Sequence, residues 1–136
     1  MTQTGTFLMF VGEQCGKAEE AVRLYTSLIA GSSIQSVERW SEGEPGGNPG
    51  EVKLCTFTLA GNRFIASDSA GPHQFTFTPS FSVFVDCGSE AEMDRLFTSL
   101  SEGGQVLMPL DDYGFGNRFG WTSDRYGVSW QINFPA

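Results

Sequence analysis

Basic residues are scarce in this sequence: 8 Lys and Arg stand against 16 Asp and Glu, which gives a formal net charge of −8. Proteins that bind nucleic acid or an anionic membrane surface depend on Lys and Arg, so this charge argues against both classes. No apolar stretch approaches the ~20 residues of a membrane-spanning helix, and the first residues lack the basic start and apolar run of a signal peptide. We therefore expect a cytoplasmic protein whose acidity serves solubility.

Thiols and imidazoles are also few. Cys15, Cys55 and Cys87 are far apart and form no CxxC pair, which argues against a zinc knuckle and against a disulfide scaffold. We expect Cys55 and Cys87 to behave as small buried residues. A reactive thiol stays open as an alternative for Cys15, because a helix start directly after it would lower its pKa. The only histidine, His73, is expected on the surface of a linker, without a catalytic partner.

What the sequence does have is an internal repeat. The hexapeptides RLYTSL (23–28) and RLFTSL (95–100) recur 72 positions apart, each within a segment whose apolar residues have helical spacing. Ser89 and Glu92 form a capping-box pattern before the second helix, and Gly31 and Gly103 are stop signals after the first and second helix. The repeat therefore marks two helices that carry one apolar face each.

The strands around these helices follow one order in both halves. Apolar runs precede the two helices, and three strand-like runs follow each of them. These runs cover 6–11, 33–40, 51–60 and 62–67 in the first half and 80–85, 104–110, 118–124 and 127–134 in the second.

Each half thus has the order β-α-β-β-β. We predict an α+β fold in which two tandem βαβββ modules form a curved mixed sheet. Its helix-free side is a concave cup where a small ligand could bind. The chain is expected to be one domain, 1–136, made of a module at 5–68 and a module at 79–134, joined by a linker at 69–78.

Four segments carry a family resemblance: AEEAVRLYTSLI (18–29), DRLFTSLSEGG (94–104), VLMPLDDYGFGNRFGW (106–121) and FGWTSDRYGVSWQI (119–132). With the paired modules, they resemble the PhnB-like branch of the vicinal oxygen chelate superfamily, which has the glyoxalase/bleomycin resistance/dioxygenase fold. That branch is often labelled 3-demethylubiquinone-9 3-methyltransferase. The resemblance covers roughly 6–134 and implies a homodimer. The fold hosts many chemistries, so function has to be read from the site.

The resemblance also implies where a metal would be held. Enzymes of the superfamily use His and Glu at four equivalent strand positions, which alignment of the two halves places at Thr6, Ile65, Ser80 and Gln131. Hydroxyl, alkyl and amide groups do not replace His and Glu as ligands of a divalent transition metal. We therefore expect no metal and no cofactor, as is common in PhnB-like members. A metal held elsewhere remains an alternative, with carboxylates at Glu51, Asp68, Asp111 or Asp112.

Methyl transfer from S-adenosylmethionine finds no support either. The nearest glycine pattern, Gly114-x-Gly116-x-x-x-Gly120, lies between strands, whereas a nucleotide-binding glycine motif lies between a strand and a helix.

Alternation along the strands predicts which side chains face the cup. The set mixes apolar and hydroxyl groups with one Arg and one Gln, which suits reversible binding of a small, partly apolar molecule, with an anion among the options. It comprises Thr6, Leu8, Phe10, Arg63, Ile65, Ser67, Ser80, Ser82, Phe84, Ser129 and Gln131.

The C-terminal segment FGWTSDRYGVSWQI (119–132) and the loop before it add further expectations. Trp130 is expected in the core and Asp124 in a turn, while Trp121 belongs to the core, to the cup or to a dimer contact. The glycine-rich loop 111–119, with Tyr113 and Phe115, is a candidate flap over the cup.

Three functions follow from this set. The first is a small-molecule-binding or sequestering protein without turnover. The second is an enzyme of the lyase, isomerase or dioxygenase type, with a non-standard metal site or a non-metal mechanism. The third is a structural or regulatory partner protein with a vestigial cup.

Overall fold

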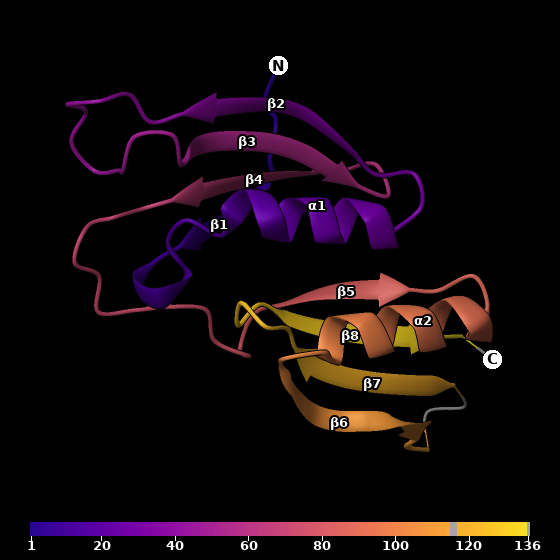
Figure 1. Ribbon diagram of the computed structural model, residues 1–136. Coiled ribbons are helices and arrows are strands. Elements are labelled where there is room, and N and C mark those ends of the chain that lie inside the picture. Colours follow the sequence, from indigo (N-terminus) through magenta and orange to yellow (C-terminus); the bar gives the residue numbers. More distant parts are fainter. Residues whose placement is uncertain (115–116, 136) are drawn as a thin grey trace. The chain divides into compact units, whose positions relative to one another are not determined.

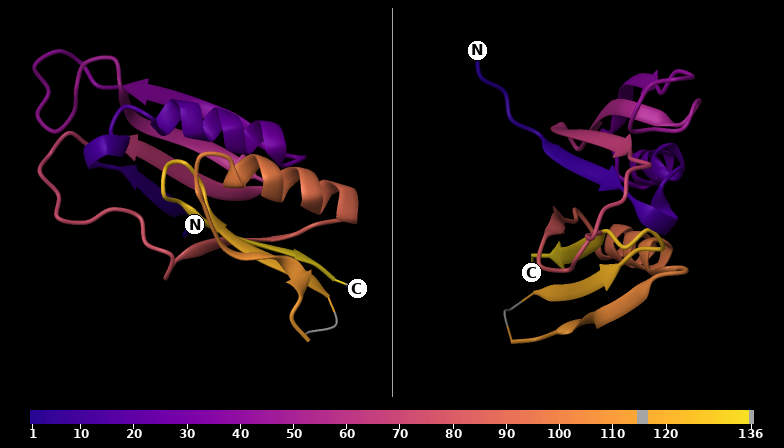
Figure 2. Two further views of the ribbon diagram at one scale, coloured as in Figure 1. Left: turned by 60° about the horizontal axis from the view of Figure 1, so that its bottom comes forward. Right: turned by 90° about the vertical axis from the view of Figure 1, so that its left-hand side faces the viewer.

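The computed structural model describes residues 1–114 and 117–135. The chain divides into two compact units, Met1–Thr76 and Phe77–Ala136, and each unit contains one βαβββ module. The predicted order of helices and strands is confirmed in both halves, and each module forms its own four-stranded sheet with one helix on it (Figures 1 and 2). Among the described residues, no helix is long and apolar enough to cross a membrane.

The first module comprises β1 (Thr6–Phe10), the short 3-10 helix η1 (Gly12–Gln14), α1 (Ala18–Leu28), β2 (Ser33–Arg39), β3 (Val52–Leu59) and β4 (Asn62–Asp68). Its sheet order is β1-β4-β3-β2, with β1 parallel to β4 and the other neighbours antiparallel. The apolar face of α1, with Val22 and Tyr25 fully buried, packs on the sheet side that carries Phe10, Phe57 and Ala66.

Asp68, at the end of β4, ties this sheet to its helix. One carboxylate oxygen accepts the backbone N–H groups of Gly16 at 2.8 Å and Ala18 at 3.0 Å, and the other accepts that of Val52 at 3.0 Å. Lys17, the residue before α1, makes no side-chain cap of its own. A carboxylate 50 residues later in the chain therefore satisfies the free N–H groups of this helix start.

The second module comprises β5 (Ser82–Asp86), α2 (Glu90–Ser101), β6 (Gln105–Asp112), β7 (Arg118–Ser123) and β8 (Ser129–Phe134). The sheet order β5-β8-β7-β6 repeats that of the first module, again with the first two strands parallel. The predicted capping role of Ser89 is confirmed, because its hydroxyl accepts the N–H of Glu92 at 3.1 Å. Gly103 follows the helix with φ of +73°, a backbone conformation that favours glycine.

Candidate ligand pocket in the second module

Strand register assigns side chains to the two faces of the second sheet. Residues paired across neighbouring strands share a face, and successive residues alternate. Trp130 and Ile132 are fully buried on the side that α2 covers. Gln131 lies between them and faces the opposite, helix-free side, together with its strand partners Phe84 and Trp121. The prediction that Trp130 belongs to the core is confirmed.

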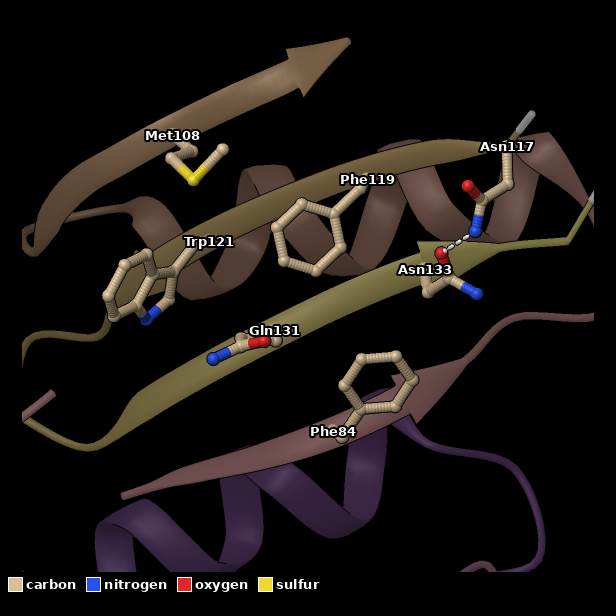
Figure 3. Close-up of a pocket in the computed structure, with 7 residues that line it drawn as sticks. All are labelled: Phe84, Met108, Asn117, Phe119, Trp121, Gln131 and Asn133. Atoms are coloured by element: carbon tan, nitrogen blue, oxygen red, sulfur yellow. Dashed lines mark hydrogen bonds between the residues drawn. The ribbon is translucent and has the colours of Figure 1, made fainter. Parts of the chain in front are cut away.

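A pocket of about 450 Å³ is hollowed into this helix-free face (Figure 3). Its size is typical of pockets that hold small molecules. Four apolar side chains and three side-chain amides line it, and none of these seven residues is charged. They are Phe84 on β5, Met108 on β6, Phe119 and Trp121 on β7, Gln131 and Asn133 on β8, and Asn117 directly before β7.

One chain of hydrogen bonds fixes the Trp121 end of the pocket. The Trp121 indole N–H donates to the Ser129 hydroxyl at 2.8 Å, and the Ser129 and Ser82 hydroxyls lie 2.7 Å apart. The Gln131 Nε2 group donates to the Ser82 hydroxyl at 3.3 Å. Ser129 is only 1% exposed, so it acts as a buried support that holds the indole ring directly and the Gln131 amide through Ser82.

A second chain fixes the opposite end. The Nδ2 group of Asn133 donates to the Asp86 carboxylate at 2.8 Å, and its Oδ1 atom accepts from the Nδ2 group of Asn117, as the dashed line in Figure 3 shows. The Oδ1 atom of Asn117 is buried and has no hydrogen-bond partner among the described residues. Both ends of the pocket therefore present oriented amides between aromatic side chains.

The predicted cup residues of the second module divide into two groups. Ser82, Phe84, Ser129 and Gln131 lie on the helix-free face, and so does Trp121, for which core, cup and dimer contact were all open. The placement of Ser80 on a strand is wrong, because β5 begins at Ser82 and the exposed Ser80 hydroxyl lies 2.7 Å from that of Thr78.

In the first module, the face assigned to β1 requires a correction. Arg63, Ile65 and Ser67 lie on the helix-free face as predicted, because they alternate with the buried Phe64 and Ala66. The strand pairing places Phe7 beside Ile65 and Thr6 beside Phe64.

The prediction that Thr6, Leu8 and Phe10 face the cup is therefore wrong. Leu8 is 2% exposed and Phe10 is fully buried on the side of α1, whereas Phe7 is 48% exposed on the open face. The phase of this short strand could not be read from alternation, since all five residues after Thr6 are apolar.

The loop between β6 and β7 was expected to contribute a flap. The Tyr113 hydroxyl donates to the Pro109 carbonyl at 2.5 Å, and its ring meets Phe119 edge to face with centroids 6.4 Å apart. Tyr113 thus contacts a pocket residue without being one of the lining residues. Phe115 lies outside the described residues, and the flap stays a prediction.

Four lining residues were missed from the sequence: Met108, Asn117, Phe119 and Asn133. Alternation along the strands could have identified two of them. Asn133 lies two residues after Gln131, and Phe119 lies two residues before Trp121, so each shares a face with a predicted residue. Asn117 precedes its strand, and β6 has irregular register around Met108, so alternation could not identify these two.

The four positions implied for a metal are not equivalent in the structure. Ile65 and Gln131 face the open side of their sheets, but Thr6 faces the helix side and Ser80 precedes its strand. The register places Phe7 and Phe84 beside Ile65 and Gln131 instead, and neither ring offers a lone pair to a metal.

Carboxylates do not supply a substitute cluster. Within 1–114 and 117–135, no group of three or more His, Cys, Asp or Glu residues is placed to hold a metal. Asp68 uses both oxygens on backbone N–H groups. Asp111 and Asp112, at the end of β6, accept the backbone N–H groups of Asp112 and Gly114, at 2.8 Å each. The expectation that the protein binds no metal stays a prediction.

Cys15 is the thiol for which a lowered pKa was an option, and that option is wrong. Burial raises the pKa of Cys15 to about 11, and Glu51, which accepts from its thiol at 3.5 Å, adds to the rise. The helix start that was expected to lower this pKa is already occupied by the Asp68 carboxylate. Cys55 and Cys87 are buried as predicted.

Comparison with known proteins agrees with this fold. A family profile described as 3-demethylubiquinone-9 3-methyltransferase matches residues 2–133. The solved structure of the PhnB protein from Bacillus cereus is 47% identical with a TM-score of 0.90, over 98% of this chain and 99% of that one. A protein from Pseudomonas aeruginosa is 26% identical with a TM-score of 0.82, over 99% of this chain and 98% of that one.

A more distant structure shows the fold alone. The glyoxalase/bleomycin resistance protein/dioxygenase from Alicyclobacillus acidocaldarius is 12% identical with a TM-score of 0.53, over 98% of this chain and 92% of that one. A comparison with functionally curated proteins finds no match. The resemblance drawn from the sequence is thereby confirmed at the level of family and fold.

Proposed function

We propose that this chain, which belongs to the 3-demethylubiquinone-9 3-methyltransferase family in the PhnB-like branch of the glyoxalase/bleomycin-resistance superfamily, is a metal-free small-molecule-binding protein. Its ligand occupies the pocket on the helix-free face of the second module. The observation that carries the proposal is the lining of that pocket, which combines aromatic walls with oriented amides.

The same lining argues against turnover. Acid–base or nucleophilic catalysis needs a titratable or nucleophilic group within hydrogen-bond reach of the reacting atoms. Amides, phenyl rings, an indole and a thioether supply neither. The lining also lacks a positive charge, so it does not support the anionic ligand that the sequence left open. The methyl transfer named in the family description is not part of the proposal, since Gly114 and Gly120 flank the start of β7 rather than a helix.

Binding can be measured with a neutral fluorescent probe, N-phenyl-1-naphthylamine, whose emission rises in apolar surroundings. We expect saturable binding at one site per chain, with the probe recovered unchanged in mass after prolonged incubation. Phe84→Ala removes a pocket wall and should weaken binding about three- to tenfold, the scale of an aromatic contact.

Phe7→Ala is the matched control. Phe7 is 48% and Phe84 is 55% exposed, and both lie on the helix-free face of the first strand of their module, but only Phe84 lines the pocket. Equal losses in the two variants would contradict the assignment of the site, and so would a probe that does not saturate. Conversion of the probe, lost on chelation and restored by metal, would favour the enzyme alternative.

A further inference from the structure

Strand pairing places a carboxylate on either side of the pocket. One row of paired residues on the helix-free face runs from β6 to β5 through Asp111, Phe119, Asn133 and Asp86. Phe119 and Asn133, in the middle of this row, line the pocket. Asp111 and Asp86 are exposed, and they stand on the two edge strands of the sheet. The pocket is therefore flanked by an acid at each edge of its own face.

The place of Asp111 depends on an irregularity in β6. Three positions separate Met108 from Asp111, whereas their partners on β7 are only two positions apart. Regular alternation would put Asp111 on the face opposite to that of Met108. The extra residue of the bulge returns Asp111 to the same face, and Leu110 takes the helix side, where its side chain packs over Gly120.

No basic residue offsets these two acids on their own face. The second module has three bases, and all of them lie on or beside α2. Arg95 belongs to that helix, Arg118 donates to two of its acids at 3.3 and 3.4 Å, and Arg125 lies 4.0 Å from Glu102 at its end. Within 77–114 and 117–135, the helix-free face thus combines aromatic rings and amides with acids alone.

The aromatic rings favour the same sign of charge as the acids. A ring is negative on its face, so a cation is attracted to the face and an anion is repelled. Figure 3 looks onto the helix-free side, and the rings of Phe84 and Phe119 turn their faces toward it. Neighbouring strands are about 4.8 Å apart, so a charge over Phe119 lies about 5 Å from Asp111, one strand away, and about 10 Å from Asp86, two strands away.

We propose that the pocket selects organic cations whose positive charge is carried by a flat aromatic ring, such as an N-alkylated heteroaromatic ring. Asp111 and Asp86 are the residues that set this charge preference. The inference rests on the proposed binding function and adds the chemical class of the ligand. The charged ring lies over Phe119, between the two acids, and extends toward the other aromatic side chains of the lining.

Two probes of similar shape and opposite charge test this preference. N-methylquinolinium and 1-naphthoate both contain two fused six-membered rings, but the first is a cation and the second an anion. Each is titrated into the ¹⁵N-labelled full chain at about 10 mM salt, where the Debye length is about 30 Å. The indole N–H signal of Trp121 and the backbone signals of pocket residues are followed by NMR.

We expect N-methylquinolinium to bind at least about tenfold more tightly than 1-naphthoate. At the dielectric constant of water, carboxylates about 5 and 10 Å away correspond to factors of about four and two in affinity. These factors strengthen binding of the cation and weaken binding of the anion.

Variants separate the charge of the two acids from the shape of the pocket. Asp111→Asn should weaken binding of the cation and strengthen binding of the anion by about fourfold each, and Asp86→Asn should do the same by about twofold. A change in pocket shape would instead move both affinities in the same direction. Glu102→Gln is the matched control, because it removes one exposed acid at the end of α2 and should leave both affinities unchanged.

The outcomes distinguish the inference from the proposed function. Binding of 1-naphthoate as tight as that of N-methylquinolinium overturns the cation preference and leaves the proposed binding function standing. Affinities that move in the same direction in Asp111→Asn, or that change equally in Glu102→Gln, overturn the role of the two acids. Absence of pocket shifts with both charged probes, while N-phenyl-1-naphthylamine still saturates, overturns the inference alone. Absence of binding by all three probes overturns both.

Discussion

The turn between β7 and β8 depends on one buried acid, and replacing it should be costly. Asp124 is 3% exposed. Its Oδ1 atom accepts the backbone N–H groups of Tyr126 at 2.9 Å and Val128 at 3.0 Å, and its Oδ2 atom accepts the indole N–H of Trp130 at 2.9 Å. In Asp124→Asn, the amide keeps its oxygen on the two backbone groups and turns its NH₂ group against the indole N–H, so that two donors face each other.

The magnitude follows from these contacts. A buried indole N–H without an acceptor costs about 1–3 kcal/mol, and converting two hydrogen bonds to a charged oxygen into neutral ones costs about 0.5–1 kcal/mol each. Relief from burying a charge offsets part of this, so we expect a loss of about 2–4 kcal/mol in the free energy of unfolding. Urea denaturation followed by far-UV circular dichroism should show a midpoint lower by roughly 1.5–2.5 M.

A double-mutant cycle isolates the contact with Trp130. In a Trp130→Phe background the opposing donor is gone, so the further change Asp124→Asn should cost about 1–3 kcal/mol less than it does in the unaltered protein. A midpoint for Asp124→Asn within ~0.3 M of the unaltered protein would refute the structural role of this acid. A coupling energy near zero would show that the indole N–H does not depend on Asp124.

Three further outcomes are expected. Because burial and Glu51 raise the pKa of Cys15 to about 11, its alkylation by iodoacetamide at pH 8 should be roughly a hundredfold slower in the folded protein than in urea; equal rates would contradict the raised pKa. Hydrogen bonds from Arg39 and Arg23 lower the pKa of Glu19 to about 2, so its stabilising contribution is present above the unfolded pKa near 4.5 and is lost as the pH falls toward 2. Glu19→Gln should therefore flatten the acid limb of the stability curve, and an unchanged limb would argue against it. Protein purified without chelator should contain less than ~0.1 equivalent of Zn, Ni, Mn or Fe by elemental analysis, the level expected without a closed ligand set; a stoichiometric metal would overturn the metal-free proposal.

The order of helices and strands could be predicted because the repeat supplied two independent versions of it. The apolar residues around Tyr25 and Phe97 recur at helical spacing, which differs from the pattern of the flanking strands. Glycines such as Gly31 and Gly103 mark where the helices end. The capping of α1 could not be predicted in this way. Its N–H groups are satisfied by Asp68, which is close in space but far along the chain, whereas Ser89 caps α2 locally.

The face of a strand was predictable only where polar residues interrupt it. In β8, polar Ser129, Gln131 and Asn133 alternate with Trp130 and Ile132, and the predicted face agrees with the structure. In β1, the run Phe7 to Phe10 is apolar throughout, so either phase is compatible with the sequence. The deciding factor was the parallel pairing with β4, which sets Leu8 beside Ala66 and the helix. That information lies in a contact 58 positions along the chain.

The direction of the amides in the pocket could be predicted from the sequence less well than the location of the pocket. The alternation of Gln131 and Asn133 indicates amides on an open face. The direction of an amide decides whether its oxygen or its NH₂ group faces a given partner. Ser82 fixes the direction of the Gln131 amide and Asp86 that of the Asn133 amide. Asp86 lies at the end of β5, a position that the sequence alone indicates only as the end of a strand. Only the strand pairing of Asp86 with Asn133 brings the carboxylate to the amide and fixes its direction.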